Sequence, residues 1–134
     1  MHNISKYILA LFFLVAGSCH FIDPGFYSGL IPDYLPYQNA LNVVSGIVEI
    51  VLGLLVLFPK TRKIAGILLI AMLIIFIASH VHFTKLGSCI QDGLCIPEWI
   101  SYIRLLVVHP ILMIWVAKVC ITPIKKHNIA NANS

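Results

Sequence analysis

Residues 40–58 read ALNVVSGIVEIVLGLLVLF, an apolar run in which Glu49 is the only charged side chain. An α-helix rises about 1.5 Å per residue, so a run of this length covers most of the ~30 Å hydrocarbon layer of a bilayer. Three further apolar runs of similar length occupy residues 7–21, 64–83 and 100–119. The pattern predicts an all-α, integral membrane four-helix bundle over residues 1–121, followed by a short polar cytoplasmic tail at 122–134.

The composition of the whole chain agrees with a protein embedded in a membrane. Of its 134 residues, 60% are hydrophobic and only 10% are charged, and the mean hydropathy is +0.96. So little polar surface cannot cover a water-soluble globule. We therefore expect the lipid bilayer to be the main partner of this chain.

The distribution of charge predicts how the helices are oriented. A net charge of +4 would suit nucleic acid in a soluble protein, but membrane topology explains the basic residues more simply, and we expect no nucleic-acid binding. Alternate ends of the predicted spans carry Lys6, Lys60, Arg62, Lys63, Lys118, Lys125 and Lys126. The loops on the other side contain Lys85 together with Asp23, Asp33, Asp92 and Glu98. Since cytoplasmic loops carry the excess of Lys and Arg, both termini are predicted to be cytoplasmic.

A stripe of small and polar residues runs along the second span. Asn42, Ser45, Gly46, Glu49 and Gly53 recur at the helical spacings of three and four, with Ser45 and Gly46 adjacent, which places them on one helix face. Gly46 and Gly53 favour close packing against another helix. An ionised carboxylate at the bilayer centre costs about 2.5–3.5 kcal/mol on insertion scales. Glu49 is therefore expected to have a partner or a proton.

Other ionisable residues of the spans are candidates for that partner. In the predicted topology His20, His80, His82 and Arg104 lie in the outer third of the bilayer, and His109 lies deeper, near the level of Glu49. The simplest neutralisation is a Glu49–Arg104 pair, direct or relayed by histidine or water. Two interpretations stay open: the pair only fixes helix register, or it belongs to a functional polar site that opens to the outer face.

The histidines do not predict a metal site. His80 and His82 are two residues apart, about 200° around a helix, so both cannot face one ion unless the helix has frayed. A three-histidine arrangement of His20, His82 and His109 remains geometrically open. We assign no metal ligand.

Cys89 and Cys95 share the predicted outer loop, with the turn dipeptide at residues 92–93 between them. The outer side is oxidising, and such a turn brings its two flanks together, so an intramolecular disulfide is expected. Two roles remain open for it. It is either a static staple or a redox-active pair that exchanges with Cys19, near the outer end of the first span.

Several motifs, in this order along the chain, resemble one known family. They are AGSCHF (16–21), IPDYLP (31–36), SGIVE (45–49), PKTR (59–62) and IRL (103–105). Together they resemble the DoxX-like membrane proteins, over roughly residues 5–118. The resemblance implies a multi-pass protein of the bacterial inner membrane, with polar family positions at His20, Glu49, His80, His82 and Arg104.

What the resemblance implies about function is a class rather than a reaction. DoxX-like proteins include a subunit associated with thiosulfate:quinone oxidoreductase, and the related MauE-like proteins are linked to disulfide formation. We therefore expect a redox-associated protein that works with a quinone or a thiol partner at the outer face. Quinone is the one cofactor class this implies, and no independent enzymatic activity is assigned.

Two alternatives to a redox role are kept. The chain is either a non-catalytic accessory or assembly subunit, whose helix stripes bind partner subunits or further copies of itself, or a small carrier that couples a solute to a proton through Glu49.

Overall fold

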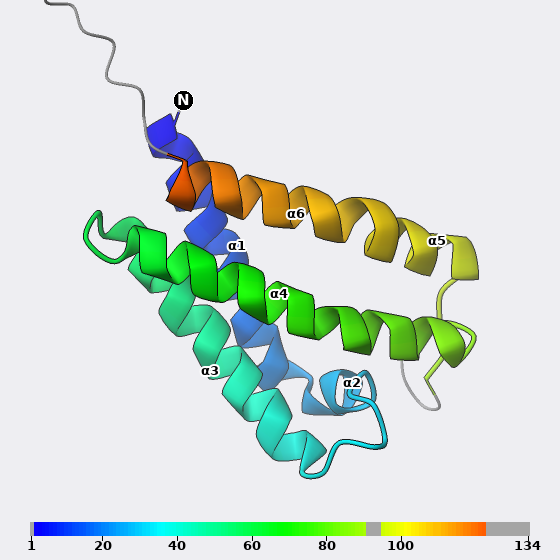
Figure 1. The fold of residues 1–134 in the computed structure, drawn as a ribbon. Coiled ribbons are helices and arrows are strands. Elements are labelled where there is room, and N and C mark those ends of the chain that lie inside the picture. Colours follow the sequence, from blue (N-terminus) through cyan, green and yellow to red (C-terminus); the bar gives the residue numbers. More distant parts are fainter. Residues whose placement is uncertain (1, 91–94, 123–134) are drawn as a thin grey trace, which may run out of the picture.

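The computed structural model describes residues 2–90 and 95–122, and this part of the chain is helical (Figure 1). Its elements are α1 (His2–Ile22), α2 (Pro24–Ser28), α3 (Gln38–Leu57), α4 (Arg62–Lys85), α5 (Glu98–Ile103), η1 (Arg104–Val108), α6 (His109–Val116) and η2 (Ala117–Ile121). The last four run on without a break as one helix, Glu98–Ile121, in which η1 and η2 are π-helical turns.

The described residues contain four helices that are long and apolar enough to cross a membrane. This confirms the predicted all-α class and the predicted number of apolar spans. Each helix is longer than its apolar run; α4, for example, begins at Arg62 and ends at Lys85. The predicted polar tail lies outside the described residues from position 123 onward.

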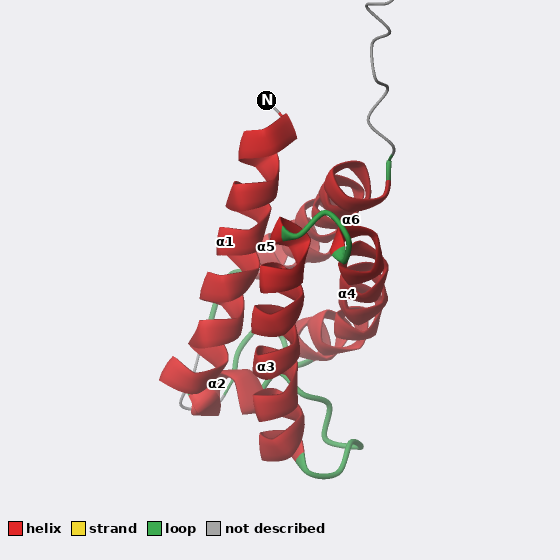
Figure 2. Ribbon diagram, turned by 90° about the vertical axis from the view of Figure 1, so that its left-hand side faces the viewer, coloured by secondary structure: helices red, strands yellow, loops and turns green. Residues whose placement is uncertain are grey.

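The long helices form two antiparallel pairs. Helix α1 packs along α3, and α4 packs along the helix Glu98–Ile121, while α3 and α4 join the pairs. Figure 2 shows α1 and α3 side by side along their length, whereas Figure 1 shows the two pairs converging at one end and splaying apart at the other. We call the converging end, with Lys6, Lys60, Arg62, Lys63 and Lys118, the basic end. The other is the loop end, which holds α2 and the α4–α5 connection.

The hydrophobic core lies toward the basic end, where the pairs meet. Its buried members are Leu9, Phe13, Leu52, Val56, Ala65, Leu69, Met72, Leu73, Val116, Val119 and Cys120. The connection between α3 and α4 is held by side-chain caps: Arg62 donates to the carbonyl oxygens of Val56 and Leu57, and Thr61 donates to that of Leu55. These bonds satisfy the last carbonyls of α3, which have no partner within the helix.

Glycines allow α1 and α3 to approach closely. A Cβ built on Gly46 would lie 2.8 Å from the His20 Cβ and 2.9 Å from the Gly17 carbonyl oxygen. A Cβ on Gly53 would lie 3.1 Å from the Phe13 Cβ and 3.3 Å from the Ala10 carbonyl oxygen. Small residues are used this way where helix backbones pack at short range in membranes. Gly46 and Gly53 therefore both pack against α1.

The fourth helix widens beside its internal proline. The N–H of His109 donates to the Arg104 carbonyl, five residues back, which closes a π-turn immediately before Pro110. Proline lacks an N–H and its ring crowds the carbonyl four residues earlier, so a regular α-turn is unfavourable there. The wider turn takes the place of a sharp kink, and it begins at Arg104.

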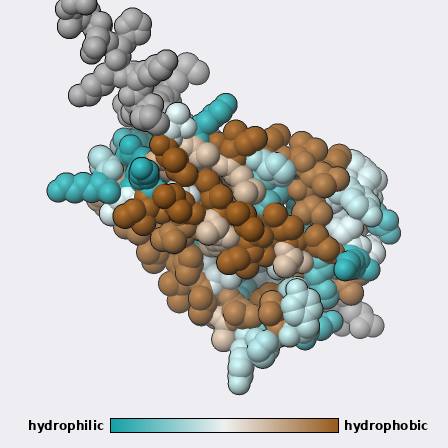
Figure 3. Space-filling model, viewed as in Figure 1, coloured by the Kyte–Doolittle hydropathy of each residue, from teal (hydrophilic) through white to brown (hydrophobic). Residues whose placement is uncertain are grey.

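The surface of the bundle fits an apolar solvent. Figure 3 shows hydrophobic residues over the middle of one face and hydrophilic residues gathered toward its ends. Large aliphatic side chains of the long helices are exposed, among them Ile8, Ile47, Ile75, Leu106 and Ile111. Exposed side chains of this kind are costly in water but not in lipid.

Candidate functional site

The chain between α1 and α3 folds over the splayed loop end. Asp23 caps α2 by accepting a hydrogen bond from the Phe26 N–H at 3.1 Å, and Pro24 fits its first turn. After α2 the chain turns inward, so that Leu30 and Pro32 are buried. The Gln38 side chain then donates to the Ile31 carbonyl and ties the end of this segment to α3. We call residues 24–37 the cover segment.

A cavity of about 240 Å³ lies beneath the cover segment, between the two helix pairs. Its walls are largely apolar. The side chains that carry polar atoms are His20, Tyr27, Asn42, Ser45, Glu49, Ser79, His80 and Arg104. A mostly apolar cavity with a few convergent polar groups is the usual form of a small-molecule site.

Four of the six predicted polar-core residues line this cavity: His20, Glu49, His80 and Arg104. His109 is buried behind His80, with its ring centroid 4.8 Å from that of His80. His82 is half-buried and lies outside the cavity lining. The four lining residues come from α1, α3, α4 and η1, so each long helix contributes one.

One side of the cavity holds a chain of three polar side chains. The Asn42 Nδ2 donates to the His20 carbonyl oxygen at 3.0 Å, which orients its Oδ1 toward the His20 Nδ1 at 2.6 Å. That oxygen can only accept, so the His20 Nδ1 carries a hydrogen. The His20 Nε2 lies 3.6 Å from the Glu49 Oε1. All three residues are buried, with Asn42 2%, Glu49 4% and His20 7% exposed.

The other side of the cavity holds the guanidinium of Arg104. Its Nη2 donates to the His80 Nδ1 at 3.1 Å, and its Cζ lies 5.8 Å from the centre of the Phe83 ring. Behind His80, the His109 Nε2 donates to the Leu73 carbonyl oxygen at 2.7 Å. His80 thus holds Arg104 at the cavity wall through a hydrogen bond, and His109 packs behind His80.

The expected Glu49–Arg104 contact is not made. Among the residues that the structure describes, the acid–base contact within 4.0 Å is that of Glu49 with His20. The reason is the close α1–α3 packing at Gly46, which brings His20 to Glu49, whereas Arg104 belongs to the other helix pair across the cavity. His20, rather than Arg104, therefore contacts the Glu49 carboxyl group.

Tyr27 is a site residue that sequence reasoning did not select. Its ring lies over the His20 ring, with centroids 4.0 Å apart and planes inclined by 33°. Burial raises the pKa of the Tyr27 hydroxyl, and the nearby Cys19 and Glu49 raise it further, so it stays a neutral donor. Its interfacial setting was readable from the sequence, but its contact with His20 depends on the inward turn after α2.

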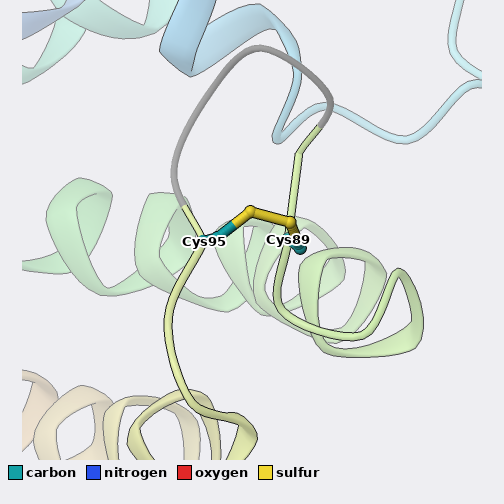
Figure 4. The surroundings of a disulfide bond; sticks show 2 residues. All are labelled: Cys89 and Cys95. Carbon is teal, nitrogen blue, oxygen red and sulfur yellow. A yellow bond between two sulfur atoms is a disulfide. The ribbon is translucent and has the colours of Figure 1, made fainter.

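The cysteines fall into three places. Cys89 and Cys95 lie at disulfide-bonding distance across the two arms of the connection after α4, and Figure 4 shows their side chains pointing toward each other. The predicted turn at residues 92–93 lies outside the described residues. Cys19, the predicted redox thiol, is half-buried and unpaired, and Cys120 is buried at the basic end.

The cysteine connection touches the cover segment. A Cβ built on Gly29 would lie 2.9 Å from the Ile90 Cγ2, so Ile90, next to Cys89, packs directly on this glycine.

For the part of the chain that is described, no group of three or more His, Cys, Asp or Glu side chains is placed to hold a metal ion.

Comparison with known proteins gives one match. No curated protein and no solved structure matches the chain, so the resemblance to DoxX-like proteins stays a prediction. A family model matches residues 9–120, a range that includes most of α1, nearly all of the other three long helices and the lining of the cavity. The chain belongs to the family described as Domain of unknown function (DUF8561).

Proposed function

We propose that this chain is a redox-associated, DoxX-like protein of the bacterial inner membrane, with both termini in the cytoplasm and with a quinone site in its cavity. The orientation is supported by the basic end, because Lys and Arg concentrate on the cytoplasmic side of membrane proteins. In that orientation the cover segment and the Cys89–Cys95 pair face the oxidising side, where a disulfide persists.

The observation that carries the proposal is the pairing of opposite hydrogen-bonding groups across an apolar cavity. The Arg104 guanidinium is a donor suited to a quinone carbonyl. Across from it, the Glu49 Oε2 is buried and has no hydrogen-bond partner among the described residues, so it suits the hydroxyl of a quinol. The walls between them, including Leu30, Ile75 and Phe76, suit a ring and the start of its tail.

The Cys89–Cys95 pair is the proposed electron donor or acceptor. A bound quinone would act as the oxidant, since two thiols lose two electrons and two protons as the S–S bond forms, and the same electrons and protons convert the quinone to the quinol. The contact between Ile90 and Gly29 supports this coupling because it joins the cysteine connection to the cover of the cavity. Glu49 and His20 face each other and share one proton. This arrangement suits transfer of that proton to an oxygen atom of the bound ligand.

A single-turnover measurement tests the proposal. Full-length protein in lipid nanodiscs is reduced, freed of reductant and mixed with a short-tailed quinone, and quinol formation is followed by ultraviolet absorbance. We expect about one quinol per chain, together with loss of the two alkylatable thiols of Cys89 and Cys95. Cys89→Ser should bind the quinone without reducing it, while Cys120→Ser, at the basic end, should behave like the unchanged protein.

Two results would contradict the proposal. If the unchanged protein does not bind quinone, the cavity has another use, and an accessory role becomes the better explanation. If quinone binds but Cys89→Ser still forms quinol, the electrons do not come from this cysteine pair.

A further inference from the structure

The net charge of the cavity follows from its hydrogen bonds. The His20 Nε2 and the Glu49 Oε1 face each other at 3.6 Å. Two lone pairs facing each other would repel, and so would two hydrogens, so the favourable arrangement has one hydrogen between the two atoms. With the hydrogen on Glu49 both groups are neutral, and with it on His20 they form a cation and an anion. The pair is therefore neutral overall in either arrangement.

Arg104 is left as the uncompensated charge. A guanidinium has no acceptor and stays protonated in proteins, so the His80 Nδ1 must accept its hydrogen bond, and His80 is neutral. Among the described side chains, no carboxylate lies within 4.0 Å of Arg104. An unpaired cation in a membrane-spanning segment is costly and usually marks a functional site.

The position of Arg104 suits an incoming ligand. It is the first residue of the π-turn before Pro110, and turns of this kind inside helices are frequent at functional sites. Its one side-chain hydrogen bond among the described residues is to His80, which leaves the other N–H groups of its planar fork free. Such a fork matches the two oxygens of a carboxylate or phosphate group.

We propose that the cavity binds an amphipathic ligand with a singly charged anionic headgroup, held by Arg104, and an apolar body that packs against the cavity walls. A neutral quinone leaves the charge of Arg104 uncompensated, and an anionic headgroup neutralises it. This inference rests on the proposed function only in that the cavity is taken to be a ligand site. The largely apolar walls distinguish such a ligand from a free inorganic anion, which would leave them unfilled.

Three small probes separate headgroup from body. Octanoate has the anion and the apolar body, octan-1-ol has the body alone, and acetate has the headgroup alone. Binding is measured by saturation-transfer NMR on the full chain in zwitterionic nanodiscs, with the signal from empty nanodiscs subtracted. We expect saturable one-to-one binding of octanoate, binding of octan-1-ol at least about tenfold weaker, the effect of one charge-assisted hydrogen bond, and no competition by acetate.

Two variants assign the effect to one side chain. Arg104→Gln should weaken octanoate binding about tenfold or more and leave octan-1-ol unchanged. Lys85→Gln removes a cation from the same end of the bundle but outside the cavity, and it should leave both affinities unchanged. Should Arg104→Gln fail to fold, the comparison of octanoate with octan-1-ol on the unchanged protein still decides the question.

The outcomes distinguish this inference from the quinone proposal. Quinone binding with no preference for octanoate over octan-1-ol would overturn the inference alone. Octanoate binding without quinone binding would uphold the inference and overturn the quinone site. If neither ligand saturates, both fall, and competition by acetate as strong as that by octanoate would overturn the amphipathic class.

Discussion

Adding a methyl group should destabilise the protein at Gly46, between α1 and α3, but not at Gly25, in α2. In Gly46→Ala the new Cβ would lie 2.8 Å from the His20 Cβ and 2.9 Å from the backbone oxygen of Gly17. Backbone atoms cannot rotate away, so the two helices must separate. At Gly25, in α2, the nearest atom to a new Cβ is the Asp23 Oδ1 at 3.8 Å, which is ordinary contact.

The expected magnitudes follow from two opposing effects. Alanine is favoured over glycine in a helix by about 1 kcal/mol. Overpacking a tight contact costs about 1–3 kcal/mol. Gly46→Ala should therefore lower the free energy of unfolding by up to about 2 kcal/mol. Gly25→Ala should leave it unchanged or raise it by up to about 1 kcal/mol. Gly53→Ala, whose nearest contact is 3.1 Å, should fall between them.

Reversible unfolding in detergent–SDS mixtures, followed by circular dichroism, measures these differences. The double variant Gly17→Ala/Gly46→Ala adds a sharper test, because the same small separation relieves both clashes. It should cost less than the sum of the two single changes. Gly46→Ala as stable as Gly25→Ala, or strict additivity of the Gly17 and Gly46 changes, would refute the close α1–α3 packing from which the His20–Glu49 contact is derived.

Three further predictions concern charge, topology and redox state. His20→Ala and Glu49→Ala should each lower the free energy of unfolding by as much as about 3–5 kcal/mol, and a double-mutant cycle should show strong coupling between them. The effects of Glu49→Ala and Arg104→Ala should be close to additive. Coupling of Glu49 to Arg104 instead of His20 would contradict the site. A reporter that works only in the cytoplasm should be active when fused after Ser134 and inactive when inserted near Asp92, and the reverse pattern would invert the proposed orientation. Protein isolated without reductant should resist alkylation at Cys89 and Cys95. For a pair that exchanges thiols, we expect a reduction potential above about −300 mV, since a lower potential indicates a structural staple.

The hydrophobic pattern of the sequence predicts most of the fold. Apolar runs of spanning length predict the four long helices, because this pattern depends on local sequence. Helix rise also predicts which ionisable residues lie at similar heights along the bundle. The six polar-core candidates were His20, Glu49, His80, His82, Arg104 and His109. Four of them, His20, Glu49, His80 and Arg104, line one cavity, whereas His82 and His109 lie outside its lining.

The sequence does not show in the same way which neighbouring helix each of these residues faces. Depth alone does not say whether Glu49 turns toward α1 or toward the fourth helix. The direct contact with Arg104 was therefore wrong, and the carboxyl group contacts His20 instead. The deciding contacts are tertiary: Gly46 against Gly17 sets the spacing of α1 and α3. The inward turn after α2 likewise brings Tyr27 onto His20, although a tyrosine in a proline-rich loop also fits a purely interfacial position.

The separation of core and cavity along the helix axes gives the two halves of each long helix different evolutionary freedom. Residues of the basic half, such as Leu69 and Val116, hold the fold together and tolerate little change in volume. Residues of the loop half, such as Ser45 and Ser79, face the cavity and contribute little to that core. Away from Gly46 and the His20–Glu49 pair, substitutions there should change the lining of the cavity with little effect on the stability of the folded chain. The lining of the cavity can in this way vary more freely than the core that holds the helices together.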